Sequence, residues 1–304
     1  MTKSAFLIIR NPDMRRFLKK VKNDLIYLSV RIFLAIFSLL PLCLTGRILK
    51  FLALSASFLP IKENRIALKN LSMFYDRKKS REILQKMYSH YADSIAEVIA
   101  VVFKKRELHT IAQISEESKR VLEEALGEKK GIIYFTAHLG NWELMAMTLA
   151  ADEYRTNTIA KESYDPRFTK LIRYFRETNG VRCIFRKEEG ILEKITDVIK
   201  SNQIMGFLID QNTRVPSLNI TFLGREAPTP LLPVKILKET GAALVVGYNH
   251  RIDGKIQTEI KRIIYSADED ERDILEKVNK VLSEEILKYP HEWIWIHDRW
   301  NIFC

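Results

Sequence analysis

The chain has 304 residues, of which 47% are hydrophobic and 29% charged, a composition that excludes disordered and fibrous proteins and allows a single large α/β unit. Its net charge of +11 is concentrated in residues 1–86, where 18 lysines and arginines stand against 5 acidic residues. Because this basic segment brackets the most hydrophobic stretch of the chain, it is typical of contact with an anionic membrane surface and argues against nucleic acid as a partner.

The hydrophobic stretch itself predicts a membrane anchor. Residues 25–61 contain only three charged side chains, those of Arg31, Arg47 and Lys50. The longest uncharged run, 32–46, has 15 residues, fewer than the ~20 that a membrane-spanning helix normally needs. Basic residues on both sides of the run favour attachment to a membrane over burial inside a soluble domain.

Two arrangements of this anchor follow from the sequence. In the first, residues 25–46 cross the bilayer once, because Arg31 can extend its charged group toward the headgroups. In the second, the Leu40-Pro41 step divides the stretch, and residues 25–40 and 47–59 lie as two helices in the membrane interface.

Helix and strand patterns alternate through the rest of the chain. We predict helices over 80–103, 116–127, 142–151, 166–178, 188–201, 230–241 and 270–288. We predict strands over 130–136, 156–161, 181–186, 204–210, 242–251 and 256–264, with a long loop over 211–228. This alternation predicts an α/β fold with a mainly parallel central sheet covered by helices.

Two further features complete this division of the chain. Near the C-terminus, Trp293, Trp295 and His297 alternate as on a strand with one buried face, which predicts packing roles for the tryptophans and a structural hydrogen-bonding role for His297. We divide the chain into a basic N-terminus with its anchor, 1–61, and one α/β domain, 62–304.

Several common catalytic motifs are absent from the sequence. None of the 11 glycines forms a GxG, and neither a P-loop nor a GxSxG elbow is present, which argues against NTP-driven transfer, nicotinamide redox chemistry and ordinary serine hydrolysis. The 3 cysteines are far apart and form no CxxC pair, which excludes a cysteine zinc site and a disulfide framework and predicts a reducing compartment.

The residues after the predicted strand 130–136 carry the clearest chemical signal. On one continuous helix, His138 and Glu143 would point about 140° apart. If His138 instead lies in a turn allowed by Gly140, and Asn141 caps the following helix, the Glu143 carboxylate can reach the imidazole. Such a pair suits a general base that deprotonates an alcohol. From spacing alone, a loop histidine and a solvated glutamate are the more frequent interpretation.

The wider sequence resembles a known family. HLGNWE at 138–143 is similar to the His-x-x-x-x-Asp/Glu motif of glycerolipid acyltransferases, in the form found in the late (secondary) acyltransferases of lipid A biosynthesis. Further segments are similar to that family in the same order, over about residues 20–300: IALKNL at 66–71, DQ at 210–211, FLG at 222–224, APT at 227–229 and WIWIHDRW at 293–300.

The resemblance implies an O-acyltransferase of the bacterial inner membrane with its catalytic domain on the cytoplasmic face. Such an enzyme moves a fatty acyl chain from acyl carrier protein to a hydroxyl of a lipid A precursor, among inner-membrane phospholipids and without a metal or other cofactor. By matching position, His138 would be the base, Glu143 its partner and Asp210 a further essential acid. The substrate-binding candidates are Gly140, Asn141, Arg173, Arg176 and Arg186, of which the arginines would contact phosphate or the forming oxyanion.

Three other functions stay open at this point. A second kind of enzyme would keep the same base but acylate another membrane glycolipid, such as a mannoside, with acyl-CoA as donor. A hydrolase would release the acyl chain to water. A non-catalytic membrane-bound relative would keep only the fold.

Overall fold

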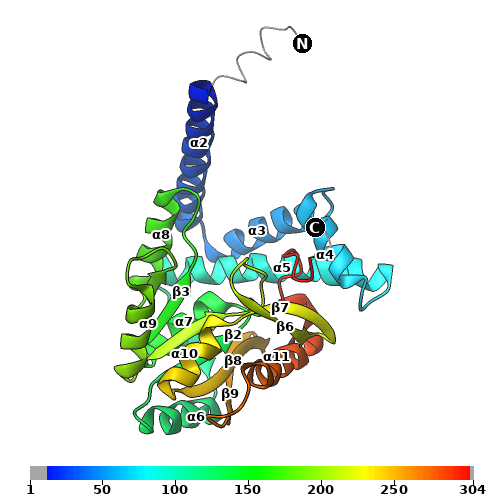
Figure 1. Cartoon of the computed structure of the whole chain (residues 1–304). Coiled ribbons are helices and arrows are strands. Elements are labelled where there is room, and N and C mark those ends of the chain that lie inside the picture. The colour runs from blue at the N-terminus through cyan, green and yellow to red at the C-terminus, as the bar shows by residue number, and fades with distance from the viewer. Residues whose placement is uncertain (1–11, 302–304) are drawn as a thin grey trace.

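The computed structural model describes residues 12–301 and begins with a long helix that projects from the body of the molecule (Figure 1). This helix, α2 (Pro12–Leu39), ends at the Leu40-Pro41 step and is followed by α3 (Leu42–Ser57) and α4 (Lys62–Leu71). Proline has no N–H to continue the helical ladder, so the break falls where the sequence predicted it. The prediction of one continuous membrane-crossing helix over residues 25–46 is therefore wrong, because α2 ends at Leu39 and α3 begins at Leu42.

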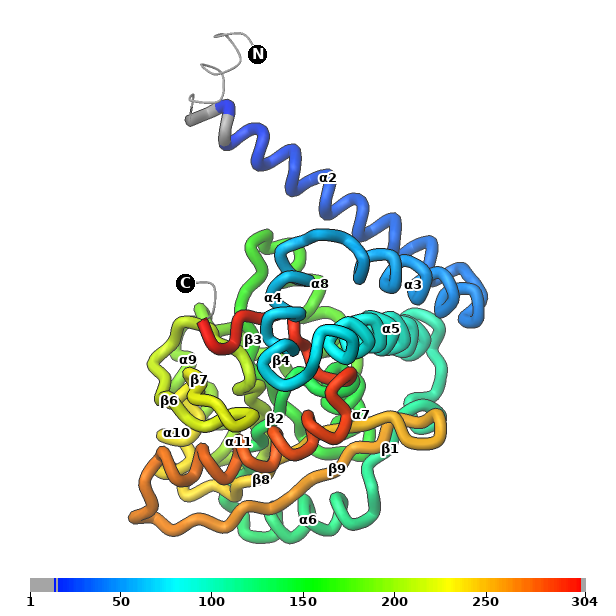
Figure 2. Tube along the Cα trace, turned by 90° about the vertical axis from the view of Figure 1, so that its right-hand side faces the viewer, coloured from blue at the N-terminus to red at the C-terminus, as the bar shows by residue number. Residues whose placement is uncertain are grey.

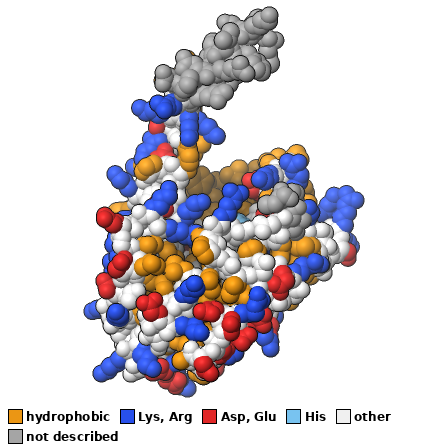
Figure 3. Space-filling view, viewed as in Figure 1, with side chains coloured by type: hydrophobic (Ala, Val, Ile, Leu, Met, Phe, Trp, Pro, Cys, Tyr) orange, Lys and Arg blue, Asp and Glu red, His pale blue; other side chains and the backbone are white. Residues whose placement is uncertain are grey.

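The N-terminal helices α2 and α3 expose many large hydrophobic side chains. On α2 these include Phe17, Leu18, Leu25, Leu28, Ile32 and Leu39, and on α3 and the residues after it Phe51, Leu52, Phe58 and Leu59. In Figure 3, orange side chains gather between the projecting helix and the opposite corner of the molecule. Within residues 12–301, no single helix meets the length and hydropathy that a membrane crossing requires, whereas α3 and α4, bent by 77°, meet them together.

A seven-stranded sheet with the order β1-β9-β8-β2-β5-β3-β4 forms the centre of the domain. Neighbouring strands run parallel except for the antiparallel pair β8 and β9, so the predicted mainly parallel sheet is confirmed. The strands are β1 (Ala112–Ile114), β2 (Ile132–Thr136), β3 (Thr156–Ala160), β4 (Arg182–Phe185), β5 (Ile204–Leu208), β8 (Ala243–Ile252) and β9 (Lys255–Ile263).

Helices cover both faces of this sheet. They are α5 (Arg77–Val102), α6 (Glu116–Gly127), α7 (Trp142–Ala151), α8 (Pro166–Glu177), α9 (Ile191–Lys200), α10 (Leu232–Thr240) and α11 (Glu271–Lys288), with short 3₁₀ turns η1 (Leu108–Thr110) and η2 (Pro290–Glu292). Figure 2 shows α5 beside the C-terminal segment, and α5 contacts η2.

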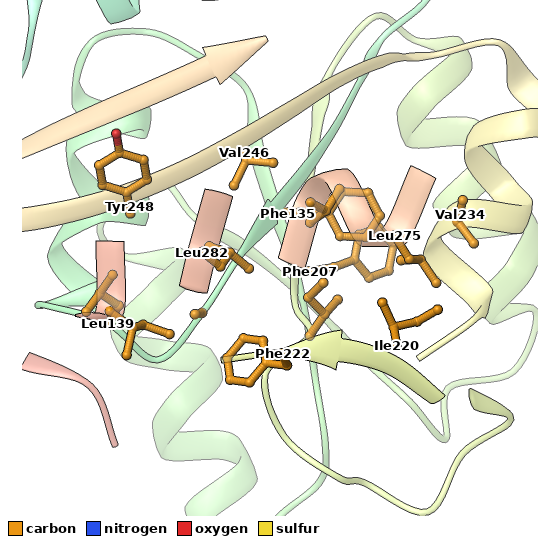
Figure 4. Packing of buried hydrophobic residues seen from close by; sticks show 14 of the residues in the cluster. Phe135, Leu139, Phe207, Ile220, Phe222, Val234, Val246, Tyr248, Leu275 and Leu282 are labelled. Carbon is orange, nitrogen blue, oxygen red and sulfur yellow. The ribbon is translucent and has the colours of Figure 1, made fainter. Parts of the chain in front are cut away.

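Side chains of the central strand β2 alternate between the two faces. Ile133 and Phe135 pack into the large cluster formed with α9, α10 and α11, part of which Figure 4 shows. Ile132 and Tyr134 pack with α6 and α7 on the opposite face. Because helices cover both faces, all four side chains are buried and the strand reads as a continuous apolar run.

Three parts of the fold differ from the sequence prediction. The predicted loop 211–228 contains an antiparallel hairpin of β6 (Ser217–Phe222) and β7 (Arg225–Pro230), so α10 begins at Leu232 instead of residue 230. The strand β1 was not predicted. The C-terminal tryptophans do not lie on a strand, although Trp293 forms one isolated bridge with Leu139. Trp293 and Trp295 are buried, as predicted, and their indole N–H groups donate to Asp210 Oδ2 and to the Pro290 carbonyl.

Candidate active site

The turn after β2 is fixed by hydrogen bonds from two other parts of the chain. Gly140 has φ +65°, and a Cβ added there would lie 1.9 Å from Asn249 Oδ1. The Gly140 amide donates to the Glu292 carbonyl at 2.9 Å, and the Asn141 amide donates to Asn249 Oδ1 at 2.8 Å. The Asn141 side chain caps α7, as predicted. Both predicted substrate-binding residues of this turn, Gly140 and Asn141, are buried and bonded within the protein, so they shape the turn.

His138 meets a carboxylate that comes from the neighbouring strand. Its Nδ1 lies 2.8 Å from Asp210 Oδ1, and its backbone N–H donates to Asp210 Oδ2 at 2.8 Å. The indole N–H of Trp293 donates to the same Oδ2 at 2.8 Å. The Asp210 side chain is fully buried, whereas 22% of the His138 side chain is exposed.

The register of the sheet explains this contact. Thr136 of β2 pairs with Leu208 of β5 in a parallel arrangement, and His138 and Asp210 each follow two residues later. The carboxyl ends of parallel strands meet at one edge of a sheet, where functional groups from different strands come together. Two residues that are 72 positions apart in the chain are therefore brought into contact.

Asp210 is held as a carboxylate. Burial alone would raise its pKa, but the charge of His138 and the three hydrogen bonds outweigh burial and lower the pKa to about 2. An ionised carboxylate only accepts hydrogen bonds, so the proton of the neutral imidazole is on Nδ1. His138 Nε2 then carries a lone pair, as a general base requires.

The predicted partner of His138, Glu143, is engaged elsewhere. Glu143 is the second residue of α7, and its carboxylate accepts from Arg176 Nε at 3.0 Å and from Arg176 Nη2 at 2.6 Å. Burial alone would lower the pKa of Arg176, but Glu143 raises it, so the guanidinium stays protonated. The prediction that Glu143 holds the imidazole is therefore wrong, and Asp210 takes that position.

The three candidate arginines lie in different surroundings. Arg176 is paired with Glu143, and Arg173 is paired with Glu188 at 2.6 Å. Arg186 is half-buried, and no carboxylate of the described part of the chain lies within ion-pair distance of it. Burial lowers the pKa of Arg186 from its ordinary value, although the guanidinium stays protonated at neutral pH. It is the arginine best placed to receive an external anion.

Arg186 lines an apolar cavity of about 400 Å³. The wall is formed mainly by hydrophobic side chains of β3, β5, α9 and residues 230–233, with Lys235 as its other cation. Ile209, the residue before Asp210, belongs to the same wall, so the cavity approaches the His138–Asp210 pair. A second cavity, of only about 30 Å³, lies beside Trp142 and the Glu143–Arg176 pair.

Sequence reasoning missed a second histidine–carboxylate pair. His250 Nδ1 lies 2.8 Å from Glu292 Oε2, and both side chains are buried. The two residues are 42 positions apart in the sequence, so no local motif could have predicted the pair. The Glu292 carbonyl also accepts the hydrogen bond of the Gly140 amide, so the pair helps to hold the turn that carries His138. No cluster of histidine, cysteine or acidic side chains suited to a metal ion occurs between residues 12 and 301.

Comparison with known proteins adds the following. The sequence profile of a family described as bacterial lipid A biosynthesis acyltransferase matches residues 14–301. Two curated relatives, both named phosphatidylinositol mannoside acyltransferase and both from Mycobacterium tuberculosis (strains ATCC 25618 / H37Rv and CDC 1551 / Oshkosh), are 24% identical over 126 residues. This alignment covers 41% of the chain and 40% of each relative, so the chain spans about two fifths of their length.

Proposed function

The chain belongs to the bacterial lipid A biosynthesis acyltransferase family, and on this premise we propose that it transfers a fatty acyl chain from a thioester to a hydroxyl of a lipid A-type glycolipid. The observation that carries the proposal is the contact between His138 Nδ1 and the buried Asp210 carboxylate at the edge of the sheet. Because the ring proton is on Nδ1 in this contact, Nε2 has a free lone pair, and the His138 ring is partly exposed.

The proposed reaction needs no nucleophilic side chain. His138 Nε2 takes the proton of the acceptor hydroxyl while the hydroxyl oxygen attacks the thioester carbonyl carbon. The carbonyl oxygen becomes an oxyanion, and its electrons re-form the C=O bond as the C–S bond breaks. The imidazolium then returns its proton to the departing thiolate. Asp210 stabilises the imidazolium and keeps the ring in the required tautomer and orientation.

We assign the donor acyl chain to the 400 Å³ cavity. Its apolar wall suits a hydrocarbon chain, and the cations Arg186 and Lys235 suit the phosphate of a phosphopantetheine arm. That arm is common to acyl carrier protein and acyl-CoA. We favour acyl carrier protein, because the basic N-terminal 86 residues would attract an acidic protein as well as an anionic glycolipid.

To test this function, the purified protein is incubated with a tetra-acylated disaccharide acceptor and a panel of acyl carrier protein and acyl-CoA thioesters. We expect acceptor molecules heavier by one acyl group, read by mass spectrometry, and preferred chain lengths limited by the cavity. His138→Gln should lower the rate by roughly 10²–10⁴-fold, the usual contribution of a general base. Free fatty acid without acylated acceptor, or an unchanged rate in His138→Gln, would contradict the proposal.

The main alternative is acylation of another membrane glycolipid with acyl-CoA as donor. The similarity to proteins named phosphatidylinositol mannoside acyltransferase favours it. The same assay separates the two functions when a phosphatidylinositol mannoside is offered as a competing acceptor. Faster transfer to the mannoside, with acyl-CoA preferred over acyl carrier protein, would establish the alternative.

We further propose that the protein works on the cytoplasmic face of the bacterial inner membrane, with α2 and α3 lying against inner-membrane phospholipids. Phe51 and Phe58, which are 71% and 72% exposed, are suited to insertion between lipids, with nearby lysines and arginines at the headgroups. Because the acyl carrier protein is cytosolic, the domain that uses it would face the cytoplasm.

Membrane attachment predicts a specific loss of lipid binding. We expect the double variant Phe51→Glu/Phe58→Glu to bind vesicles of phosphatidylethanolamine and phosphatidylglycerol at least about 100-fold more weakly, since inserting each phenyl ring contributes about 1.5–3 kcal/mol. Co-sedimentation measures this binding. Ile264→Glu, which changes a side chain of the same 72% exposure outside the anchor, is the matched control. Equal binding by the two variants would contradict the assignment of the anchor helices.

A further inference from the structure

The projecting helix α2 meets the α/β domain at α8, and the two helices lie side by side in Figure 1. Arg167 of α8 forms an ion pair with Asp24 of α2 at 2.7 Å. The same guanidinium lies over the Tyr27 ring, with 4.5 Å between its carbon and the ring centroid. The Tyr27 ring also packs edge-on against Phe168 at 5.6 Å between centroids. These contacts hold the middle of α2 against α8.

A groove of about 550 Å³ opens between α2 and α8 next to these contacts. Its lining on α2 includes Leu34 and Ala35, which follow Arg31 by three and four positions and therefore share one face of the helix with it. From α8, Leu171 and Phe175 line the groove, again four positions apart. Among the described residues, none that lines this groove also lines either of the two cavities near the catalytic residues, so the groove is a separate site.

Positive charge exceeds negative charge at this groove. Its three cations are Arg31, Arg167 and Lys170. Arg167 pairs with two aspartates, each at 2.7 Å. Arg31 and Lys170 are exposed, and within the described part of the chain no carboxylate forms an ion pair with either; Arg31 donates only to the Tyr27 hydroxyl, at 3.3 Å. Three cations against two aspartates leave an excess of one positive charge beside an apolar wall.

We propose that this groove binds one anionic phospholipid of the membrane, with its phosphodiester held by Arg31 and Lys170. Part of an acyl chain would lie along the apolar wall. A phosphodiester carries one negative charge, which matches the excess of one positive charge, whereas a zwitterionic headgroup would bring its own ammonium group to the cations. The lipid would bridge α2 and α8. This inference rests on the proposed membrane attachment and is independent of acyl transfer.

The test is a titration of the full-length protein, purified in a non-ionic detergent, with short-chain phosphatidylglycerol, and native mass spectrometry counts the bound lipids. We expect wild type to retain one phosphatidylglycerol in preference to phosphatidylethanolamine of the same chain length. In Arg31→Gln/Lys170→Gln the Kd for phosphatidylglycerol should rise about 30-fold, because each basic side chain near an anionic headgroup contributes about 1 kcal/mol. The Kd for phosphatidylethanolamine should change little.

Two further variants separate a built site from general attraction. Lys20→Gln/Lys22→Gln removes two exposed lysines of the same helix that do not line the groove, and it should leave the Kd for phosphatidylglycerol unchanged. Ala35→Trp fills the apolar part of the groove without a change of charge, and it should weaken the binding of phosphatidylglycerol.

Equal weakening in the two double variants would overturn the inference, because overall charge and not a site would then attract the lipid. Unchanged binding in Ala35→Trp, or release of the lipid by inorganic phosphate, would overturn it in favour of a site for a free anion. Tighter binding of the tetra-acylated disaccharide than of phosphatidylglycerol would assign the groove to the acceptor instead.

The outcome can be told apart from the fate of the proposed function. A wild type that co-sediments with vesicles but retains no phosphatidylglycerol in detergent overturns this inference alone. A protein that retains phosphatidylglycerol with the expected effects of the variants, but acylates no acceptor, overturns only the proposed acyl transfer.

Discussion

Asp210→Asn is expected to reduce acyl transfer by about 10⁴-fold while the fold is kept. The asparagine has the same shape, but its amide group facing His138 Nδ1 is a donor where the carboxylate was an acceptor. The imidazole would then carry its proton on Nε2 and could no longer accept the proton of the acceptor hydroxyl; an aspartate-to-asparagine change in a comparable histidine–aspartate pair has this magnitude. Steady-state transfer rates and the thermal midpoint measure the two effects separately.

Glu143→Gln is the companion variant for this prediction, because sequence alone suggested Glu143 as the partner of His138. Its carboxylate instead accepts two hydrogen bonds from Arg176, a largely buried cation. We expect this variant to lower the thermal midpoint by leaving that cation without its counter-charge. A 10⁴-fold loss of rate at an unchanged midpoint would show instead that Glu143 acts on the imidazole.

The sheet edge shows what local sequence signals could and could not predict. The apolar run before His138, the glycine of the turn and the Asn141 cap are encoded within ten residues, and the strand, the turn and α7 are all found where predicted. The partner of the imidazole depends on strand pairing. His138 meets Asp210 because β2 pairs with β5 in one register, and no spacing within a single segment contains that information.

Long-range pairing also explains the other differences. The hairpin of β6 and β7 was read as a loop because it contains several prolines, yet Ile220 and Phe222 are fully buried and fix it against the core. His250 received no role because Glu292, its partner, lies in a different element.

Gly140→Ala is expected to damage both the stability and the activity of the protein. The added methyl group would lie 1.9 Å from Asn249 Oδ1 and 2.3 Å from the Asn249 carbonyl oxygen, so backbone as well as side chain would have to move. Asn249 exchanges two hydrogen bonds with the backbone of Asn141, and any shift is passed to the turn that carries His138. We expect a loss of about 3 kcal/mol or more in the free energy of unfolding, together with a large loss of transfer rate.

Gly224→Ala separates crowding from backbone strain. Gly224 has φ +73°, close to the +65° of Gly140, but no atom lies within 4 Å of an added Cβ. The strain of a left-handed alanine alone should cost about 1–2 kcal/mol and leave the transfer rate unchanged. Denaturant unfolding of the two variants measures the difference. If both lose the same stability, the contact between Gly140 and Asn249 does not fix the turn, and the position of His138 must depend on the Asp210 carboxylate and the Glu292 carbonyl alone.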